Sequence, residues 1–217
     1  MALQGLDLDV PAGSLLRLIG PNGSGKTTLL EILVGLRRPS AGEPHLVVPR
    51  CAVSCCPDVV ELEPWLSAHE VLEAALGLLG RRRPRHELEE ILERVGLAEV
   101  AGRRVGGFSR GMTTRLNIAA GLVAESEVLL LIDEPASALD PAGRADVLRL
   151  VAALAPATTV VLSSHDLGKV ESICGHVGIL ASGRLLYQDR FPSCSPALRD
   201  PGGRWSSARR SSRPSRR

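Results

Sequence analysis

A glycine-rich loop between two apolar runs constrains the fold of this chain most strongly. Residues 20–27 read Gly-Pro-Asn-Gly-Ser-Gly-Lys-Thr and match the pattern G-x-x-x-x-G-K-[ST] in full. The run before the loop, residues 14–19, is nearly all apolar, as expected of a strand buried in a parallel sheet. The run after it, residues 26–36, places leucines on one helical face. This context predicts a phosphate-binding loop rather than a glycine-rich turn without a ligand.

The residue types of the loop suit a triphosphate and a divalent cation. Glycines allow backbone N–H groups to converge on phosphate oxygens, Lys26 adds a positive charge, and the Thr27 hydroxyl can ligate Mg²⁺. The loop also opens a helix, whose N-terminal amides and dipole favour an anion. We therefore expect a nucleotide to contact Gly20, Pro21, Asn22, Gly23, Ser24, Gly25, Lys26, Thr27 and Thr28.

Length and composition indicate one main domain. A chain of 217 residues with 44% hydrophobic content can bury one core, with room for a subdomain. No apolar run approaches the roughly 18 residues of a membrane-spanning helix, and no signal-peptide pattern opens the chain. We expect a cytoplasmic protein. Five cysteines lack the paired spacing of a zinc site and are predicted to be reduced, small apolar residues: Cys51, Cys55, Cys56, Cys174 and Cys194.

Two amphipathic helices interrupt an otherwise alternating order of strands and helices. A second short strand is predicted over residues 51–56, and Pro57-Asp58 ends it. A helix then opens at Ser67, where Glu70 three residues later completes a capping box. Another helix is predicted over residues 87–95 and stops at Gly96. We predict an inserted α-helical subdomain, about residues 59–125.

Acidic residues follow the next apolar strand, residues 128–132. Because ligands bind at the carboxyl edge of a parallel sheet, Asp133 and Glu134 can both reach the phosphate loop there. Asp133 suits a hard cation, and Glu134 suits an attacking water. The alternative is an acidic pair that caps the following helix. His165 follows a strand at residues 158–162, and we expect it at the same edge, although a single histidine is more often structural.

These motifs resemble those of the ATP-binding subunits of ABC transporters. Residues 20–28, 133–135, 137–140 and 163–165 are similar to the Walker A, Walker B, D-loop and H-loop of that family. Residues 108–112 resemble its signature, written LSGGQ. The resemblance covers nearly all of residues 3–190. It implies an α/β P-loop NTPase fold, with a mostly parallel sheet flanked by helices, in a domain of residues 1–195.

The resemblance also implies a mechanism that needs two such domains. In the family they pack head to tail, and each ATP lies between the Walker A of one domain and the signature of the other. Lys26 and Thr27 would hold phosphate and Mg²⁺, Glu134 would polarise the water, and His165 would contact the γ-phosphate. Asp133 is implied as a metal ligand and Asp140 as the D-loop aspartate. Four residues would be presented to the partner's ATP: Ser109, Arg110, Gly111 and Met112.

The implied partners are a second ATP-binding domain and a membrane-spanning transporter subunit, which would hold the chain at the inner face of the cell membrane. The signature carries Arg110 and Met112 in place of Gly and Gln, as in many export-type members, which favours an exporter. Two rival functions stay open. One is an ATPase of the same superfamily that acts outside transport, and the other is a nucleotide-binding module without catalytic activity.

Two departures from the family affect the ligands. Asp58 stands where the Q-loop glutamine is usual, and its carboxylate can still face Mg²⁺. Residues 1–6 resemble the second strand of such domains, so the first strand and its adenine-stacking aromatic are expected to be missing. We therefore predict weak nucleotide binding with little preference among bases, unless another side chain supplies the stacking platform.

Trp65 and the C-terminal segment each admit two interpretations. Trp65 is either a core aromatic that anchors the helical subdomain or a contact for a membrane subunit. Residues 196–217 contain seven arginines and one aspartate and are predicted to be a disordered tail. This tail is either a solvated extension or a contact for anionic lipid headgroups. We expect no specific nucleic-acid partner.

Overall fold

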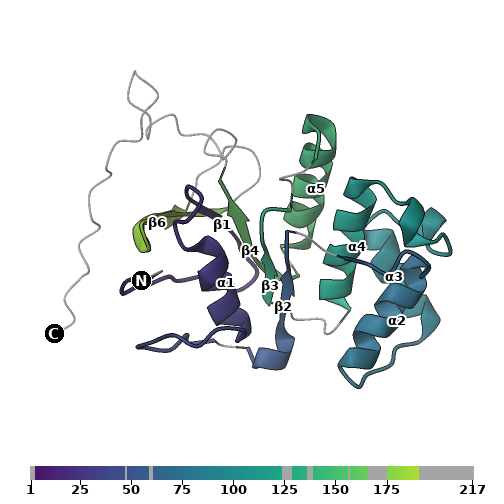
Figure 1. Ribbon diagram of the computed structural model, residues 1–217, viewed down its shortest axis with the longest axis horizontal. Coiled ribbons are helices and arrows are strands. Elements are labelled where there is room, and N and C mark those ends of the chain that lie inside the picture. Colours follow the sequence, from purple (N-terminus) through teal and green to yellow (C-terminus); the bar gives the residue numbers. More distant parts are fainter. Residues whose placement is uncertain are drawn as a thin grey trace.

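Six strands form one sheet in the part of the chain that the computed structural model describes, residues 3–46, 48–58, 61–123, 129–135, 139–155, 157–165 and 175–190. The strands are β1 (Leu15–Ile19), β2 (Val53–Cys56), β3 (Leu129–Ile132), β4 (Thr159–Ser164), β5 (His176–Ala181) and β6 (Arg184–Arg190). Their order in the sheet is β2-β3-β4-β1-β5-β6 (Figure 1). Neighbouring strands are parallel except for the antiparallel pair β5 and β6, which confirms the predicted mostly parallel sheet.

Helices cover the sheet on both sides (Figure 1). The α-helices are α1 (Lys26–Val34), α2 (Ala68–Leu78), α3 (Arg85–Arg94), α4 (Arg110–Leu122) and α5 (Pro141–Leu154). Short 3-10 helices are η1 (Arg50–Ala52), η2 (Ala98–Val100) and η3 (Val105–Gly107). Helix α1 lies on one side of the sheet, α4 and α5 lie on the other, and α2 and α3 pack beyond α4 (Figure 1).

Alternation along the strands supplies an apolar surface to each side. Because successive side chains of a strand point to opposite faces, Leu131 packs with Leu30 of α1. Its neighbours Leu130 and Ile132 instead belong to the larger core shared with α4 and α5. Strands buried on both faces are held firmly in place. Their carboxyl ends are therefore fixed relative to the loop that precedes α1.

The helical segment between β2 and β3 begins as the sequence predicts. The Ser67 hydroxyl accepts a hydrogen bond from the Glu70 N–H at 3.3 Å, and the Glu70 carboxylate accepts one from the Ser67 N–H at 2.7 Å. These bonds to Ser67 hold the pKa of Glu70 below its ordinary value. Helices α2, α3 and α4 share one hydrophobic core with a face of the sheet. The limits of a separate subdomain at about 59 and 125 stay a prediction.

Two expected strands differ in the structure. The predicted strand at residues 51–56 begins as η1, so that only Val53–Cys56 pairs with β3. The expected strand within residues 1–6 is wrong for the described residues from 3 onward, where no strand forms before β1. This segment instead lies beside β5 and β6 through mixed contacts. The Gln4 N–H donates to the Gly183 carbonyl at 2.8 Å, whereas the Asp9 N–H uses the Gln188 side chain at 3.2 Å.

Solvent exposure distinguishes between the two interpretations of Trp65, which is 62% exposed. The interpretation as a core aromatic is therefore wrong. The loop that carries it is nonetheless anchored, because Pro64 packs against Gly106 and its carbonyl accepts the Gly106 N–H at 3.0 Å. Trp65 thus stands on a fixed surface next to η3.

The cysteines in the described part of the chain, Cys51, Cys55 and Cys56, are free thiols. Burial raises the pKa of Cys56 far above its ordinary value, so this thiol stays neutral and packs as a small apolar residue. Cys174, Cys194 and the predicted tail lie outside the described residues. Within the described residues, no helix combines the length and the apolar composition that a bilayer-spanning segment requires.

Candidate functional site

The loop between β1 and α1 is held open for a ligand by its glycines. A Cβ on Gly20 would lie 2.2 Å from the Leu180 carbonyl oxygen, so only glycine permits this close passage beside β5. Gly23 and Gly25 have φ values of +77° and +106°, which glycine adopts without strain. Within the described residues, no side chain caps the start of α1. The first amides of this helix are therefore available to an anion.

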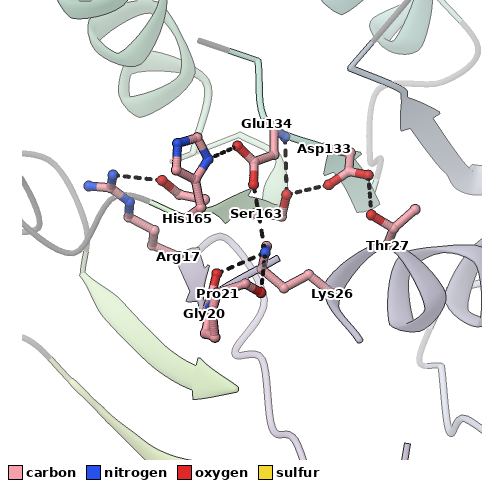
Figure 2. Close-up of polar contacts among 10 residues, drawn as sticks. Arg17, Gly20, Pro21, Lys26, Thr27, Asp133, Glu134, Ser163 and His165 are labelled. Atoms are coloured by element: carbon pink, nitrogen blue, oxygen red, sulfur yellow. Dashed lines mark hydrogen bonds and ion pairs between the residues drawn. The ribbon is translucent and has the colours of Figure 1, made fainter. Parts of the chain in front are cut away.

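Lys26 places a buried positive charge inside the loop. Its side chain is 6% exposed, and its Nζ donates to the Gly20 carbonyl at 2.9 Å and to the Pro21 carbonyl at 3.3 Å. The same Nζ lies 3.6 Å from Glu134 Oε1 (Figure 2). The ammonium group is thus positioned by the loop itself and faces a carboxylate from a different strand end.

Asp133 and Thr27 form a pair of oxygen ligands at the carboxyl end of β3. The Asp133 N–H donates to the Cys56 carbonyl at 2.9 Å, which continues the pairing of β2 with β3 beyond the last strand residue. The Thr27 hydroxyl donates to Asp133 Oδ2 at 2.7 Å (Figure 2). A hydroxyl and a carboxylate at this separation suit Mg²⁺, which commonly takes few protein oxygens and completes its shell with phosphate and water. No group of three His, Cys, Asp or Glu side chains with metal-binding geometry occurs among the described residues.

Glu134 links Lys26 to His165. The backbone of Glu134 has a φ of +45°, a left-handed conformation that is uncommon for a residue with a side chain. One carboxylate oxygen faces Lys26, and the other contacts His165 Nδ1 (Figure 2). The Glu134 side chain is 16% exposed, whereas His165 is about half exposed. The structure thus brings together the three residues that the sequence proposed for catalysis, and they come from α1 and from the ends of β3 and β4.

The loop also contains a buried hydroxyl that fits a phosphate group. Ser24 is 2% exposed, and within the described residues its Oγ has no hydrogen-bond partner. A buried hydroxyl without an acceptor is costly, and a phosphate oxygen would satisfy it. The open amides, the Lys26 charge and the Ser24 hydroxyl together fit a triphosphate.

The residues of the expected signature lie elsewhere. Ser109 caps α4, and its hydroxyl accepts the Met112 N–H at 3.3 Å. Ser109 and Arg110 are exposed, and a Cβ on Gly111 would meet no atom within 4 Å. Helix α4 packs on the face of the sheet opposite to α1 (Figure 1). The structure therefore does not bring the signature to Lys26 of the same chain.

The two remaining residues predicted for the site, Asp140 and Asp58, lie at the start of α5 and just after β2. Asp140 caps α5, and its Oδ1 accepts the Gly143 N–H at 3.0 Å. Residues 137 and 138 of the expected D-loop lie outside the described residues. Asp58 is exposed and follows β2 at the edge of the sheet that carries Asp133.

Sequence reasoning missed Ser163 of the network and also Arg17, a buried residue that contacts the adjacent Ser164. Ser163 donates to Asp133 Oδ1 and accepts the Glu134 N–H at 3.0 Å. Arg17 is 5% exposed, and its Nη2 donates to the Ser164 hydroxyl at 3.0 Å. The available signal for Ser163 was a polar residue near the end of a mostly apolar strand, at the edge where the other site residues gather. Arg17 is instead a single charged residue in the middle of the apolar strand β1.

Comparison with known proteins links this arrangement to one family. The model of the family described as ABC transporter matches residues 3–137. The daunorubicin resistance ATP-binding protein DrrA3 of Streptomyces coeruleorubidus is 39% identical over 199 residues, which cover 86% of this chain and 63% of that protein. The bacitracin transport ATP-binding protein BcrA of Bacillus licheniformis is 34% identical, with 86% and 64% covered. The chain thus spans just under two thirds of the length of these relatives.

Solved structures show the same fold. An ATP-binding cassette of an ABC transporter in its ADP conformation has a TM-score of 0.76 at 20% identity, covering 87% of this chain and 85% of that one. The cbiO1 protein of Clostridium perfringens, part of the ABC transporter complex cbiONQ, has a TM-score of 0.71 at 24% identity, with 87% and 82% covered. The predicted P-loop NTPase fold is therefore confirmed.

Proposed function

Because this chain belongs to the ABC transporter family as an ATP-binding subunit, we propose that it binds and hydrolyses ATP with Mg²⁺ to drive transport across a membrane. The observation that supports catalysis best is the contact of one carboxylate, Glu134, with both Lys26 and His165 beside the phosphate loop. A binding module without catalytic activity would not need these three groups in contact. The adjoining pair of Thr27 and Asp133 supplies the oxygen ligands that a magnesium nucleotide requires.

Each residue then has a defined task. The amides at the start of α1 and the Lys26 ammonium bind the phosphate oxygens and neutralise their charge. Thr27 and Asp133 would hold Mg²⁺, which when bound supplies positive charge to the phosphate oxygens. Glu134 accepts a hydrogen bond from the attacking water and acts as the general base that takes its proton. His165 holds the Glu134 carboxylate at its Oε2 and keeps it directed into the site.

A second copy of an ATP-binding domain completes the site in this proposal. The exposed start of α4 carries Ser109 and Gly111 on the opposite side of the sheet from α1, so a partner domain must bring its own α4 to this chain's loop. Helix α4 would then offer its N-terminal amides to the phosphate of the partner's ATP.

The glycine in this segment allows a test of that arrangement. Gly111→Glu should fold normally, because a side chain there meets only open space, yet its carboxylate would oppose the phosphates of the partner site. We expect magnesium-dependent phosphate release from ATP to fall at least about tenfold, since like charges brought together cost several kcal/mol. The same assay in EDTA gives the background without the metal. Binding of ATP to a single chain should be unchanged.

The matched control is Gly77→Glu, because Gly77 is also helical and open around its Cβ. This control should hydrolyse ATP like the wild type. Equal activity of the two variants would contradict the head-to-tail arrangement. Absence of magnesium-dependent phosphate release from the wild type and its partners would contradict the proposed hydrolysis itself.

The proposed partner in the membrane is a transporter subunit, which would hold the chain at the inner face of the membrane. We further propose export, because relatives carry the names daunorubicin resistance and bacitracin transport, and because Arg110 and Met112 resemble export-type signatures.

Trp65 is our candidate contact for that subunit. Its side chain is 62% exposed on an anchored loop, and exposed tryptophans contribute strongly at protein interfaces. Trp65→Ala should reduce co-purification with the membrane subunit by about 30-fold or more, the equivalent of a typical hot spot. Leu186→Ala is the control, because Leu186 is 66% exposed on β6, away from this loop. Loss of nucleotide binding as well as partner binding would indicate misfolding and contradict the assignment.

A further inference from the structure

Ser163 has a role that the sequence motifs do not assign. We propose that it is a positioning residue whose hydroxyl sets Asp133 for the metal ion and fixes the backbone of Glu134. This inference rests on the proposed function and extends it. The observation behind it is a single buried hydroxyl that bonds to both acidic residues of the site.

The register of the sheet places Ser163 beside the acidic pair. Strands β3 and β4 are parallel neighbours in which Ile132 is paired with Leu162, so the next residue of each strand stands at the same level. Ser163 is 1% exposed and lies between Asp133 and Glu134 (Figure 2). A buried position without contact to solvent means that its hydroxyl has only protein groups to bond.

The bond to Asp133 determines which carboxylate oxygen faces Thr27, the other residue that would hold the metal ion. The Ser163 hydroxyl donates to Oδ1, while the Thr27 hydroxyl donates to Oδ2 at 2.7 Å. The terminal torsion of aspartate is soft, so the carboxylate can turn unless its oxygens are held. With Oδ1 bound to Ser163, Oδ2 is kept toward Thr27. Groups that orient a metal ligand in this way contribute to metal affinity without touching the metal.

The bond from Glu134 supports an uncommon backbone conformation. The N–H of Glu134 donates to Ser163 Oγ at 3.0 Å, and the residue has a φ of +45°. A left-handed residue with a side chain persists where its surroundings hold it. This conformation directs the carboxylate toward Lys26 and His165 rather than along the strand. Ser163 therefore both donates to one acidic residue and accepts from the next, which requires a hydroxyl.

A matched pair of substitutions isolates that hydroxyl. Threonine and valine have nearly the same shape, so Ser163→Thr and Ser163→Val add comparable bulk, but only threonine keeps the hydroxyl. Ser163→Ala removes the hydroxyl without adding bulk and covers the case in which valine does not fit. Urea unfolding of each variant reports any general loss of stability separately.

The readout is binding of Mn²⁺, used as a paramagnetic probe in place of Mg²⁺, to the complex of the full chain with a non-hydrolysable ATP analogue. Electron paramagnetic resonance measures the free Mn²⁺. We expect Ser163→Val and Ser163→Ala to weaken Mn²⁺ binding by about 10- to 100-fold, as for other groups that orient metal ligands. Ser163→Thr should restore affinity to near the wild-type value. Binding of the analogue in EDTA should be the same for all variants.

The outcomes separate this role from the proposed function. If the alanine and valine variants bind Mn²⁺ like the wild type, even with lower stability, Ser163 only supports the fold and the inference is overturned. If threonine and valine are equally impaired, bulk rather than the hydroxyl is responsible, and the inference is again overturned. If the wild type binds no analogue at all, the proposed nucleotide function fails and this role fails with it.

Discussion

Replacing Glu134 with glutamine should lower phosphate release from ATP by about 10²- to 10⁴-fold, the range expected for loss of a general base. Glutamine has the same shape and keeps a hydrogen-bond acceptor, but it cannot take a proton from water. ATP should still bind, because the amides at the start of α1 and Lys26 are unaltered. Binding should even tighten, since a carboxylate 3.6 Å from Lys26 competes with phosphate for that ammonium. Single-turnover phosphate release and equilibrium ATP binding measure the two effects separately.

Glu31→Gln is the matched control for this prediction. Glu31 lies in α1 and pairs with Arg37 at 2.7 Å, so the same chemical change occurs outside the network of the site. It should leave both phosphate release and ATP binding near the wild-type values. Unimpaired hydrolysis by Glu134→Gln would assign the activation of water to another group and contradict the role of the Glu134–His165 contact.

Local sequence patterns were sufficient to predict the elements that carry the site. The apolar run before the loop became β1, and the helix predicted from residue 26 became α1, ending at Val34 instead of residue 36. The capping box of Ser67 and Glu70 formed as predicted, because all its hydrogen bonds lie within four residues. Such interactions depend on short-range geometry, which the order of residues alone largely determines.

The features that were predicted wrongly or missed depend on contacts between residues far apart in the chain. The N-terminal segment has strand-like alternation, but a strand also needs a backbone partner, and Asp9 finds the Gln188 side chain instead. Exposure of Trp65 depends on how its loop packs against Gly106, about forty positions later in the chain, and composition favours a buried aromatic. The hydroxyl bridge of Ser163 depends on the register of β3 against β4. None of these relations is encoded in a local pattern.

For the same reason, the sequence was sufficient to predict which residues lie at the proposed site but not which of them contact each other. Parallel strands bring their carboxyl ends to one edge, which sufficed to place Asp133, Glu134 and His165 near the loop. Their contacts are set by side-chain torsions and by the left-handed backbone of Glu134, which follows no sequence rule for glutamate. The roles of the individual residues therefore require variants for their test.

Lys26→Ala should weaken binding of ATP by about two to three orders of magnitude, because removing one partner of a buried charged contact typically costs 2–5 kcal/mol. The Lys26 ammonium is 6% exposed and is held by the Gly20 and Pro21 carbonyls, so it is already directed into the loop before a ligand arrives. Isothermal titration with ATP and with EDTA present would measure the phosphate contribution without the metal.

The control for Lys26 is Arg37→Ala, which also removes one positive charge, but beyond the far end of α1, where Arg37 pairs with the half-buried Glu31. If net charge alone attracted the nucleotide, both variants would lose affinity equally, and the assignment of Lys26 would be contradicted. If the loop geometry matters, Lys26→Arg should also bind poorly, because a planar guanidinium cannot replace a compact ammonium between two carbonyls about 3 Å away. Weak ATP binding by Lys26→Arg, together with unaffected ATP binding by Arg37→Ala, would show that ATP affinity depends on where the loop holds the charge.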